Sequence, residues 1–429
     1  MKLVVLPTEK LSGKIYLPAS KSYSIRAFII AACGGRSNIR RPSNCDDALV
    51  AMRTAQDLGA KVKEIRKHHW QVISQEAHSR SKTIRVGESG TVLRIVLPLL
   101  PIYFSSAKVS GKGTLKGRPN GFLIEALVRL GVKIKGTGKN HGIPITYSGG
   151  QLQAGIMKIN GSISSQFISA LLIAAPRLSG SSTIQLVGSK IVSSDYIQMT
   201  IQTQKLAGIR IVKKSERAYF VKGNQQYKGL KNFTVPSDYG LAAFHLAGAV
   251  LTQSTLILQG ALDDRLLQAD GHILPILKKM GIRFSKTSKS LHIKGPQAIK
   301  GGQFSLKTCP DLLPILVILA MFAKGTTRFY DIGHARVKES DRISDLRAEL
   351  EKVGAVFKEK KNELTVIPQN QYHLQKKLNP HNDHRLAMAF AVLGLKVGCQ
   401  IENIQCVNKS YPDFIKDFKF LKAKAQVVK

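Results

Sequence analysis

The 429 residues of the chain are more than one ordinary hydrophobic core accommodates, so two domains are expected. Hydrophobic residues make up 43% and charged residues 21%, which excludes a disordered chain, and no apolar run reaches the roughly 20 residues of a membrane-spanning helix. The 65 Lys and Arg against 27 Asp and Glu give a net charge of +38, which attracts anions in general.

One pattern recurs along the chain: a helix with apolar residues at helical spacing, a glycine at its end, and then an alternating strand. The glycine takes the C-cap region, where a positive φ is required. The copies are residues 51–65, 123–136, 200–214, 273–286 and 346–360, with the glycines Gly59, Gly131, Gly208, Gly281 and Gly354. Their period is about 73 residues, and residues 414–428 form a degenerate sixth copy. Six α/β units, three and three, predict two similar domains.

The first segment with candidate binding residues is residues 18–32. We expect Ser22 to cap a helix that begins near Tyr23, which places Lys21, Ser22 and Arg26 at the N-terminus of that helix. Free N–H groups and the helix dipole favour an anion there. Ordinary solvated charges at a helix start explain this segment equally well when it is taken alone.

A glycine and an arginine mark the next two helix starts. In residues 86–97, Gly90 stands in a turn where a phosphate or carboxylate could approach the backbone N–H groups closely, although a plain tight turn explains it nearly as well. Arg118 precedes Pro119 at the start of another helix and presents a guanidinium beside the N–H groups of that helix. Both positions fit anion binding.

Hydroxyl side chains open the following two helices. Ser164, Ser165 and Gln166 come together at a helix start. Capping alone would explain one serine, so two serines with a glutamine indicate recognition of a phosphate or a hydroxyl group. The next unit repeats this theme with Ser193 and Tyr196.

The second half of the chain holds the acidic candidates. Asp311 stands at the start of an apolar helix, where capping is the simpler explanation. Lys338, Glu339 and Arg342 belong to the densest charged stretch, residues 335–350. If a helix has begun there, these side chains share one face; solvated surface charge is the alternative.

Two further cations lie toward the C-terminus. Arg385 is in the first turn of a buried helix for which Asp383 is the expected N-cap, and Lys409 follows. His381, Asp383 and His384 suggest a metal site, but no helical pair of histidines and no cysteine partner supports one, so no metal is expected. The five cysteines form no C-x-x-C motif, which fits a reduced cytoplasm.

Between Lys21 and Asp413 the chain carries, in order, KSYSIR, GESGTVLR, GRP, SSQF, RVKESDR, NDHR and KSYPDF. These segments resemble the motifs of the 5-enolpyruvylshikimate-3-phosphate synthase family, the 3-phosphoshikimate 1-carboxyvinyltransferases. The resemblance implies an α/β fold of two similar domains, each of three βαβαββ repeats, in an inside-out α/β barrel. It further implies domains at residues 21–236 and at residues 1–20 with 237–429, an active site in the cleft between them, and a cytoplasmic monomer without a cofactor.

The same resemblance implies a reaction and a role for each matching residue. The expected reaction transfers the enolpyruvyl group of phosphoenolpyruvate to the 5-hydroxyl of 3-phosphoshikimate through a tetrahedral intermediate, with release of phosphate. Asp311 resembles the base that takes the hydroxyl proton, and Glu339, with Lys21 nearby, resembles the group that protonates the methylene. The residues expected to hold 3-phosphoshikimate are Lys21, Ser22, Arg26, Ser164, Ser165, Gln166, Ser193, Tyr196, Asp311 and Lys338. Those expected to hold phosphoenolpyruvate are Lys21, Gly90, Arg118, Gln166, Arg342, Arg385 and Lys409.

A few positions depart from the family pattern. Glu88 stands where asparagine is frequent, and His334 stands where some members have an asparagine that touches the substrate. Ser194 and Asp195 replace a Lys-Pro pair. These departures concern second-tier contacts, whereas the main catalytic positions match.

Two other functions fit part of the sequence. UDP-N-acetylglucosamine enolpyruvyl transferases are related, but they carry Cys or Asp in the loop before their Arg-Pro motif, and residues 111–119 contain neither. A nucleic-acid-binding protein would account for the charge of +38, but the lysines are scattered and aromatic residues make up only 7%. We therefore expect phosphoenolpyruvate and 3-phosphoshikimate as substrates, and neither nucleic acid nor a membrane as a partner.

Overall fold

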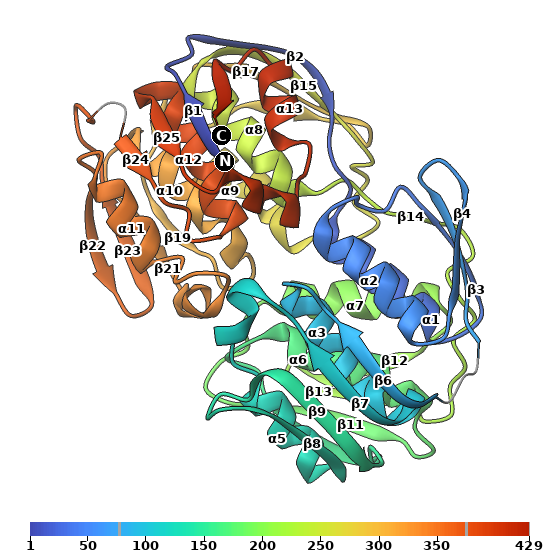
Figure 1. Cartoon of the computed structure of the whole chain (residues 1–429). Coiled ribbons are helices and arrows are strands. Elements are labelled where there is room, and N and C mark those ends of the chain that lie inside the picture. Colours follow the sequence, from blue (N-terminus) through green and yellow to red (C-terminus); the bar gives the residue numbers. More distant parts are fainter. Residues whose placement is uncertain (76–78, 374–375, 429) are drawn as a thin grey trace. The chain divides into compact units, whose positions relative to one another are not determined.

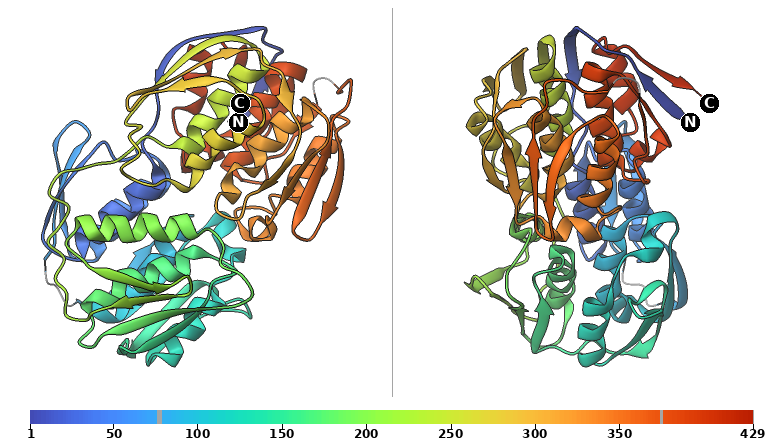
Figure 2. Two further views of the ribbon diagram at one scale, coloured as in Figure 1. Left: turned by 180° about the vertical axis from the view of Figure 1, so that it is seen from behind. Right: turned by 90° about the vertical axis from the view of Figure 1, so that its left-hand side faces the viewer.

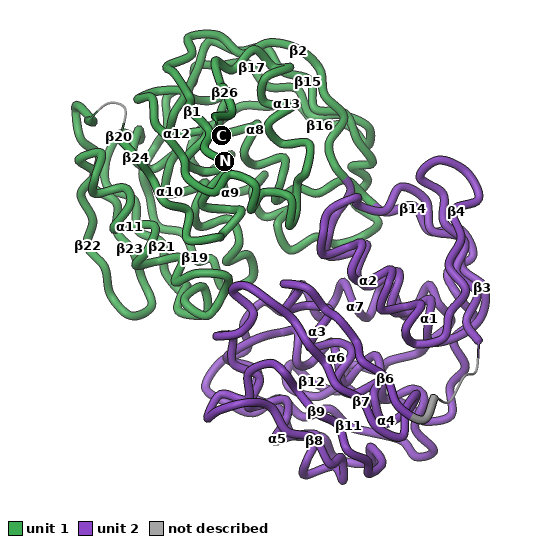
Figure 3. The backbone as a smooth tube through the Cα atoms, viewed as in Figure 1, with its two compact units in different colours: residues 1–18, 236–429 green, residues 19–235 purple. Residues whose placement is uncertain are grey.

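The computed structural model of the chain describes residues 1–75, 79–373 and 376–428 and divides into two compact units (Figure 1, with two further views in Figure 2). Unit 1 consists of Met1–Pro18 together with the chain from Pro236 onward, and unit 2 consists of Ala19–Val235 (Figure 3). The chain therefore leaves unit 1 once, builds the whole of unit 2, and returns.

Each unit has three largely apolar helices in its core. A helix that is hydrophobic on every side must be surrounded by protein, and every residue of α8 and of α10 is indeed buried. In unit 1 the three core helices contact one another. The core helices are α1 (Lys21–Ala32), α3 (Gly90–Val96) and α6 (Ser165–Ala174) in unit 2, and α8 (Tyr239–Leu251), α10 (Leu313–Met321) and α12 (His384–Val397) in unit 1.

The remaining helices are short or expose part of their surface. The α-helices are α2 (Asp46–Asp57), α4 (Leu100–Tyr103), α5 (Gly121–Arg129), α7 (Ser194–Leu206), α9 (Ile273–Lys279), α11 (Ser344–Glu351) and α13 (Phe414–Phe420). The 3-10 turns are η1 (Leu97–Leu99), η2 (Gly113–Gly117), η3 (Ala175–Arg177), η4 (Ala269–His272), η5 (Pro310–Leu312), η6 (Gly333–Val337) and η7 (Ile404–Lys409). Among the described turns, η5 leads directly into the core helix α10, while η1 and η3 directly follow the core helices α3 and α6.

Within the described ranges the strands form six four-stranded sheets, three in each unit, and all six share one pattern. One parallel pair is extended by two antiparallel neighbours, as in the order β10-β11-β13-β12. The strands of unit 2 are β3 (Arg36–Arg40), β4 (Lys61–Arg66), β5 (His69–Ile73), β6 (Ser79–Arg85), β7 (Phe104–Ser110), β8 (Val132–Thr137), β9 (Gly142–Gly150), β10 (Ile156–Asn160), β11 (Ser182–Val187), β12 (Ile211–Ser215), β13 (Ala218–Val221) and β14 (Phe233–Thr234).

Unit 1 repeats the pattern with the orders β24-β25-β1-β26, β16-β17-β15-β2 and β19-β21-β23-β22, and adds a two-stranded pair of β18 and β20. Its strands are β1 (Lys2–Val5), β2 (Lys10–Tyr16), β15 (Gln253–Gln259), β16 (Phe284–Lys286), β17 (Ser290–Gly295), β18 (Ile299–Lys300), β19 (Gln303–Ser305), β20 (Ala323–Lys324), β21 (Thr327–Tyr330), β22 (Val356–Lys360), β23 (Glu363–Ile367), β24 (Lys376–Leu378), β25 (Cys399–Ile401) and β26 (Ala425–Val428). Sheets on the outside and helices within each unit are visible in Figures 1 and 2. The predicted α/β class with six repeats and the inside-out barrel arrangement are confirmed.

Strands from distant parts of the chain complete both units. β1 pairs with β25 and with β26, so the first strand of the chain completes the sheet of the last repeat, and the two termini lie side by side (Figure 1). In unit 2, β14 pairs in parallel with β3. The first strand of unit 1 and the last strand of unit 2 are therefore each paired within a sheet of their own unit.

The five repeat glycines occupy the helix C-terminal position that the sequence predicts. Their φ angles are +95°, +90°, +89°, +84° and +82°, in chain order from Gly59 to Gly354. In the sixth copy the corresponding residue is Lys422, with a φ of +74° two residues after the end of α13. A side chain with a Cβ atom is strained in this left-handed region, whereas glycine is not.

Replacing Lys422 by glycine should therefore stabilise the protein, by about 0.5–1 kcal/mol. The same change at the exposed Lys419, inside α13, should destabilise it by a similar amount, because glycine weakens a helix interior. Urea midpoints of the two variants and the parent protein provide the measurement. A lower midpoint for Lys422→Gly would contradict the assignment of strain to this position.

Candidate active site

The first candidate cation of unit 2, Lys21, lies in the first turn of α1. The helix begins at Lys21, with Ser20 in the N-cap position, so the prediction that Ser22 caps a helix beginning near Tyr23 is wrong. The Lys21 ammonium lies 3.3 Å from the carboxylate of Asp47, which belongs to the first turn of α2. Asp47 was not among the predicted site residues. It fixes the direction of the Lys21 side chain and balances its charge.

Arg26 is 1% exposed and ties two helices of unit 2 together. Its Nε donates to the hydroxyl of Thr200 at 2.8 Å, and its two terminal nitrogens donate to the carbonyls of Ser22 and Tyr196 at 2.9 and 3.0 Å. Burial lowers the pKa of Arg26 to about 10, which leaves it protonated at neutral pH. Arg26 therefore braces α1 against α7 beneath Ser22 and Tyr196, and its expected contact with 3-phosphoshikimate stays a prediction.

Gln166 connects the α6 and α3 helices. Its amide nitrogen donates to the Thr91 hydroxyl at 2.8 Å, and its amide oxygen accepts from Arg94 at 2.7 Å. Ser164 is the N-cap of α6 and accepts the backbone N–H of Gln166 at 3.3 Å, while Ser165 is the first residue of the helix. Sequence reasoning missed Arg94 because it lies within the apolar α3.

Gly90 lies directly against Arg118. A Cβ atom at position 90 would stand 2.5 Å from Nη1 and 2.8 Å from Cζ of that guanidinium. The absence of a side chain at Gly90 thus admits Arg118, which is 5% exposed and follows the turn η2. Gly90 and Arg118, both predicted to bind phosphoenolpyruvate, are therefore neighbours in unit 2.

The α7 helix begins after a residue in an unusual backbone conformation. Ser193 has a φ of +54° and a ψ of +38°, in the left-handed region, and only 4% of its surface is exposed. Tyr196 is in the first turn of α7, where its carbonyl accepts from Arg26. A serine held in this conformation at a helix start fits the anion-binding role predicted for it.

In unit 1 a buried guanidinium gathers the acidic candidates. Arg342 is 1% exposed; its Nη1 lies 2.6 Å from Asp311 Oδ1, and its Nη2 lies 2.8 Å from Glu339 Oε2. Its Nε donates to Asp383 Oδ2 at 2.6 Å. Asp383 also caps α12 through the N–H of Arg385, as predicted. One arginine therefore fixes both predicted catalytic carboxylates.

The Asp311 carboxylate lies among three cations from two segments of the chain. Its Oδ1 is 3.2 Å from the Lys338 ammonium, and its Oδ2 is 3.4 Å from Arg385. Burial by itself would raise the pKa of Asp311. The cations outweigh burial and hold the pKa well below its usual range; they are Lys338, Arg385 and Arg342.

Arg385 and Lys409 complete the group in unit 1. Arg385 Nη1 donates to the Asp311 carbonyl at 3.0 Å, and Lys409 Nζ lies 3.7 Å from Glu339 Oε1. Arg385 also contacts Asp270 at 3.0 Å, a buried carboxylate that sequence reasoning missed. A lone acidic residue before a short helix carries no pattern of its own, so nothing in the sequence singled it out.

The loop that carries Lys338 and Glu339 is not helical. The α11 helix begins at Ser344, so the shared helix face considered for Lys338, Glu339 and Arg342 does not exist, although Glu339 and Arg342 are in contact. The loop is held instead by Arg336, which donates to Asp341 at 2.9 Å and to Glu359 on β22 at 2.7 Å.

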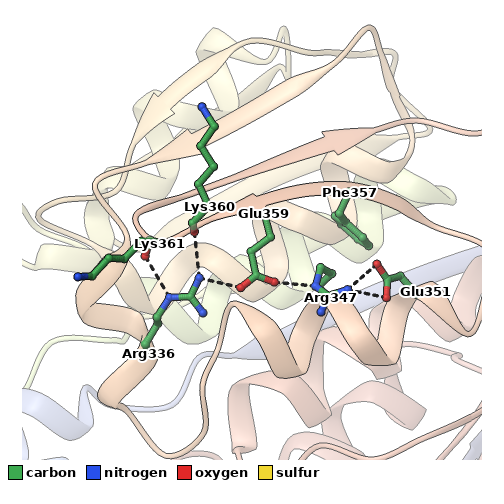
Figure 4. A pocket seen from close by; sticks show the side chains of 7 residues that line it. All are labelled: Arg336, Arg347, Glu351, Phe357, Glu359, Lys360 and Lys361. Atoms are coloured by element: carbon green, nitrogen blue, oxygen red, sulfur yellow. Dashed lines mark hydrogen bonds and ion pairs between the residues drawn. The ribbon is translucent and has the colours of Figure 1, made fainter.

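Arg336 also binds the main chain at the end of β22 and just beyond it, through the carbonyls of Lys360 and Lys361 at 2.9 and 3.0 Å. Glu359 accepts in addition from Arg347 at 2.6 Å, and these charged side chains line a surface cavity (Figure 4). Arg336 therefore holds the loop, while Lys338 and Glu339 of the same loop contact Asp311 and Arg342.

The folding pattern places the chain in a recognisable class. A solved EPSP synthase from Acinetobacter baumannii matches it with a TM-score of 0.80 and 23% identity over 100% of both chains. The enolpyruvyl transferase NikO from Streptomyces tendae matches with a TM-score of 0.79 and 16% identity, over 99% of this chain and 98% of its own. At these identities the likeness establishes the fold, which is that of an enolpyruvyl transferase.

Sequence comparison is more specific. The family model described as EPSP synthase (3-phosphoshikimate 1-carboxyvinyltransferase) matches residues 5–418. The 3-phosphoshikimate 1-carboxyvinyltransferase of Methanosarcina mazei is 34% identical over 428 residues, or 97% of each chain. That of Methanococcus maripaludis strain C7 is 33% identical over 433 residues, which cover 99% of this chain and 100% of its own. The chain belongs to the EPSP synthase family, as the sequence motifs predicted.

Two negative observations concern the described ranges alone. Residues 1–75, 79–373 and 376–428 contain no group of three or more His, Cys, Asp or Glu side chains that could hold a metal ion. In the same part of the chain no helix has the length and apolar character needed to cross a membrane.

Proposed function

We propose that this chain transfers the enolpyruvyl group of phosphoenolpyruvate to the 5-hydroxyl of 3-phosphoshikimate, in keeping with its family. The hydroxyl oxygen adds to C2 of phosphoenolpyruvate while C3 gains a proton, which gives a tetrahedral intermediate. Loss of phosphate from C2 and of a proton from C3 then restores the double bond. The observation that carries the proposal is the buried Arg342, which joins Asp311 to Glu339.

Unit 2 supplies the groups assigned to 3-phosphoshikimate. Hydroxyls, cations and N–H groups at the starts of α1, α6 and α7 suit a phosphate and neighbouring hydroxyls, because helix N-termini favour anions. The assigned residues are Lys21, Ser22, Arg26, Ser164, Ser165, Gln166, Ser193 and Tyr196, to which unit 1 would add Asp311 and Lys338.

Phosphoenolpyruvate carries a phosphate and a carboxylate, for which arginine is a suitable bidentate partner. The assigned residues of unit 1 are Arg342, Arg385 and Lys409, and those of unit 2 are Lys21, Gly90, Arg118 and Gln166. We propose that residues 1–20 with 237–429 and residues 21–236 act as two domains on one pair of substrates. The protein would do so as a cytoplasmic monomer without a cofactor.

The carboxylates of Asp311 and Glu339 would act as the general base and the general acid, respectively. Asp311 takes the proton of the 5-hydroxyl, and Glu339, with Lys21, delivers a proton to C3. The low pKa of Asp311 makes it a weak base as long as its three cations are unopposed. Binding of two anionic substrates to those cations would offset their charge and raise the pKa of Asp311, so the base becomes effective once the substrates are in place.

Phosphate release tests the proposal directly. The purified protein should release inorganic phosphate from phosphoenolpyruvate only when 3-phosphoshikimate is present, because the hydroxyl nucleophile belongs to that substrate. UDP-N-acetylglucosamine in its place should give no release, and duplex DNA at 150 mM salt should show no specific binding. Absence of phosphate with both substrates would contradict the assigned function, and release with the nucleotide sugar would favour the related transferase.

A further inference from the structure

One arginine assigned to phosphoenolpyruvate, Arg385, forms an ion pair with a carboxylate that has no assigned role, that of Asp270. Arg385 Nη2 lies 3.0 Å from Asp270 Oδ2, and Arg385 also contacts Asp311, at 3.4 Å from Nη2 to the carboxylate and 3.0 Å from Nη1 to the carbonyl. Asp311 is assigned to the chemistry, so its carboxylate cannot serve Arg385 alone. Asp270 is a carboxylate partner of Arg385 that has no assigned part in the chemistry.

The Asp270 carboxylate is fixed by its surroundings. It is 7% exposed, in the turn η4, and it lies against the first turn of α8. A Cβ atom at Gly240 would overlap Asp270 Oδ2, so the glycine is what admits the carboxylate. Gln268 anchors the turn, since its side chain donates to the Ser237 carbonyl at 2.8 Å and accepts the N–H of Tyr239 at 3.3 Å.

The charges around Asp270 make its ionised form costly. Burial raises its pKa, Arg385 from α12 lowers it, and Asp311 from η5 and Asp238 before α8 raise it further; the result is a pKa of about 6. A buried carboxylate close to two others is a poor device for stability, because desolvation and repulsion offset its ion pair. An effect on the orientation of Arg385 explains better why the Asp270 carboxylate is buried at this position.

We propose that Asp270 is a positioning residue that orients the Arg385 guanidinium for phosphoenolpyruvate. This inference rests on the proposed function of Arg385. A guanidinium with one terminal nitrogen tied to Asp270 and the other to the Asp311 carbonyl has a fixed plane, so a phosphate or carboxylate meets donors that need no reordering. Asp270 itself touches neither substrate.

The substitution Asp270→Asn tests this idea because asparagine keeps the shape and an acceptor but removes the charge. The KM for phosphoenolpyruvate should rise about tenfold or more, the KM for 3-phosphoshikimate should change little, and kcat should change less than the first KM. Protonation of Asp270 in the parent protein has the same effect as the substitution. The ratio of the two proteins' KM values for phosphoenolpyruvate should therefore approach one as the pH falls through about 6, and substrate titration cancels in this ratio.

Asp263→Asn is the matched control, because Asp263 lies on the surface in the preceding loop and pairs with Arg265. It should leave all kinetic constants unchanged. A second variant, Gly240→Ala, removes no charge but places a Cβ atom that would overlap Asp270 Oδ2 and stand 3.1 Å from Arg385 Nη1, so it disturbs this ion pair and should raise the KM for phosphoenolpyruvate in the same direction.

The outcomes are distinguishable. If the parent protein releases no phosphate with both substrates, the proposed function fails. If the parent is active and Asp270→Asn keeps its KM at every pH, the positioning role is wrong. A fall in kcat together with a rise in both KM values and a lower urea midpoint would assign Asp270 to structure alone and overturn the inference. A KM ratio for phosphoenolpyruvate that does not vary with pH would also overturn it.

Discussion

The substitution Asp311→Asn should lower turnover by about 10²- to 10⁴-fold, the range of a lost general base. Asparagine keeps the shape of the side chain and can accept from Arg342 at the same place, but it cannot take the proton of the 5-hydroxyl. KM values for both substrates should change less than kcat. Steady-state phosphate release at saturating 3-phosphoshikimate measures the effect.

The control is Asp331→Asn. Asp331 has a φ of +57°, a conformation that asparagine also tolerates. Its carboxylate accepts a hydrogen bond from the exposed Ser305 hydroxyl at 2.9 Å. It should retain the parent's turnover. Parental turnover in Asp311→Asn would restore the simple explanation of Asp311 as a residue at a helix start.

The same variant has a stability signature with a defined sign. The pKa of Asp311 lies below its ordinary value, so its ionised form stabilises the folded protein above the unfolded-state pKa of about 4. That contribution is lost as the pH falls through the lower folded-state pKa. The difference in urea midpoint between parent and Asp311→Asn should accordingly be present at pH 7 and shrink below about pH 4.

The repeat is the part of the fold that sequence reasoning reaches best. Helix C-termini such as that of α2 before Gly59 carry a local signal, because the left-handed backbone almost requires glycine. The pairing of β1 with β25 and β26 has no such signal, since it joins the two ends of the chain through backbone hydrogen bonds that any alternating strand could make. Lys422 shows the limit of the pattern: the backbone keeps the conformation after the glycine is gone.

The residues of the candidate site also differ in how far they could be predicted from the sequence. Cations at helix starts, such as Lys21, could be predicted because the helix terminus supplies the physical reason. The convergence of Asp311 and Asp383 on Arg342 could not, because it depends on tertiary packing between residues that are 31 and 41 positions apart in the sequence. Asp270 stayed hidden for the same reason, since its partner is 115 residues away in the sequence.

For Glu339→Gln we also expect turnover to fall by about 10²- to 10⁴-fold, in this case because the protonation of C3 of phosphoenolpyruvate is impaired. Glu339 is 9% exposed; its Oε2 accepts from Arg342 at 2.8 Å and its Oε1 lies 3.7 Å from Lys409. Glutamine keeps an acceptor for Arg342, so both substrates should bind with KM values close to those of the parent. What is lost is the exchangeable proton that C3 of phosphoenolpyruvate must gain.

Isotope exchange separates this role from that of Asp311. In D2O with 3-phosphoshikimate present, the parent should incorporate deuterium at C3, because a methyl group forms in the intermediate and is deprotonated again. Glu339→Gln should abolish this incorporation, whereas Glu351→Gln, a half-exposed partner of Arg347 on α11, should leave it intact. Undiminished incorporation in Glu339→Gln would remove Glu339 from the acid role. Lys21 would then be the remaining candidate donor, since the resemblance places it beside the same methylene and its ammonium is held in direction by Asp47.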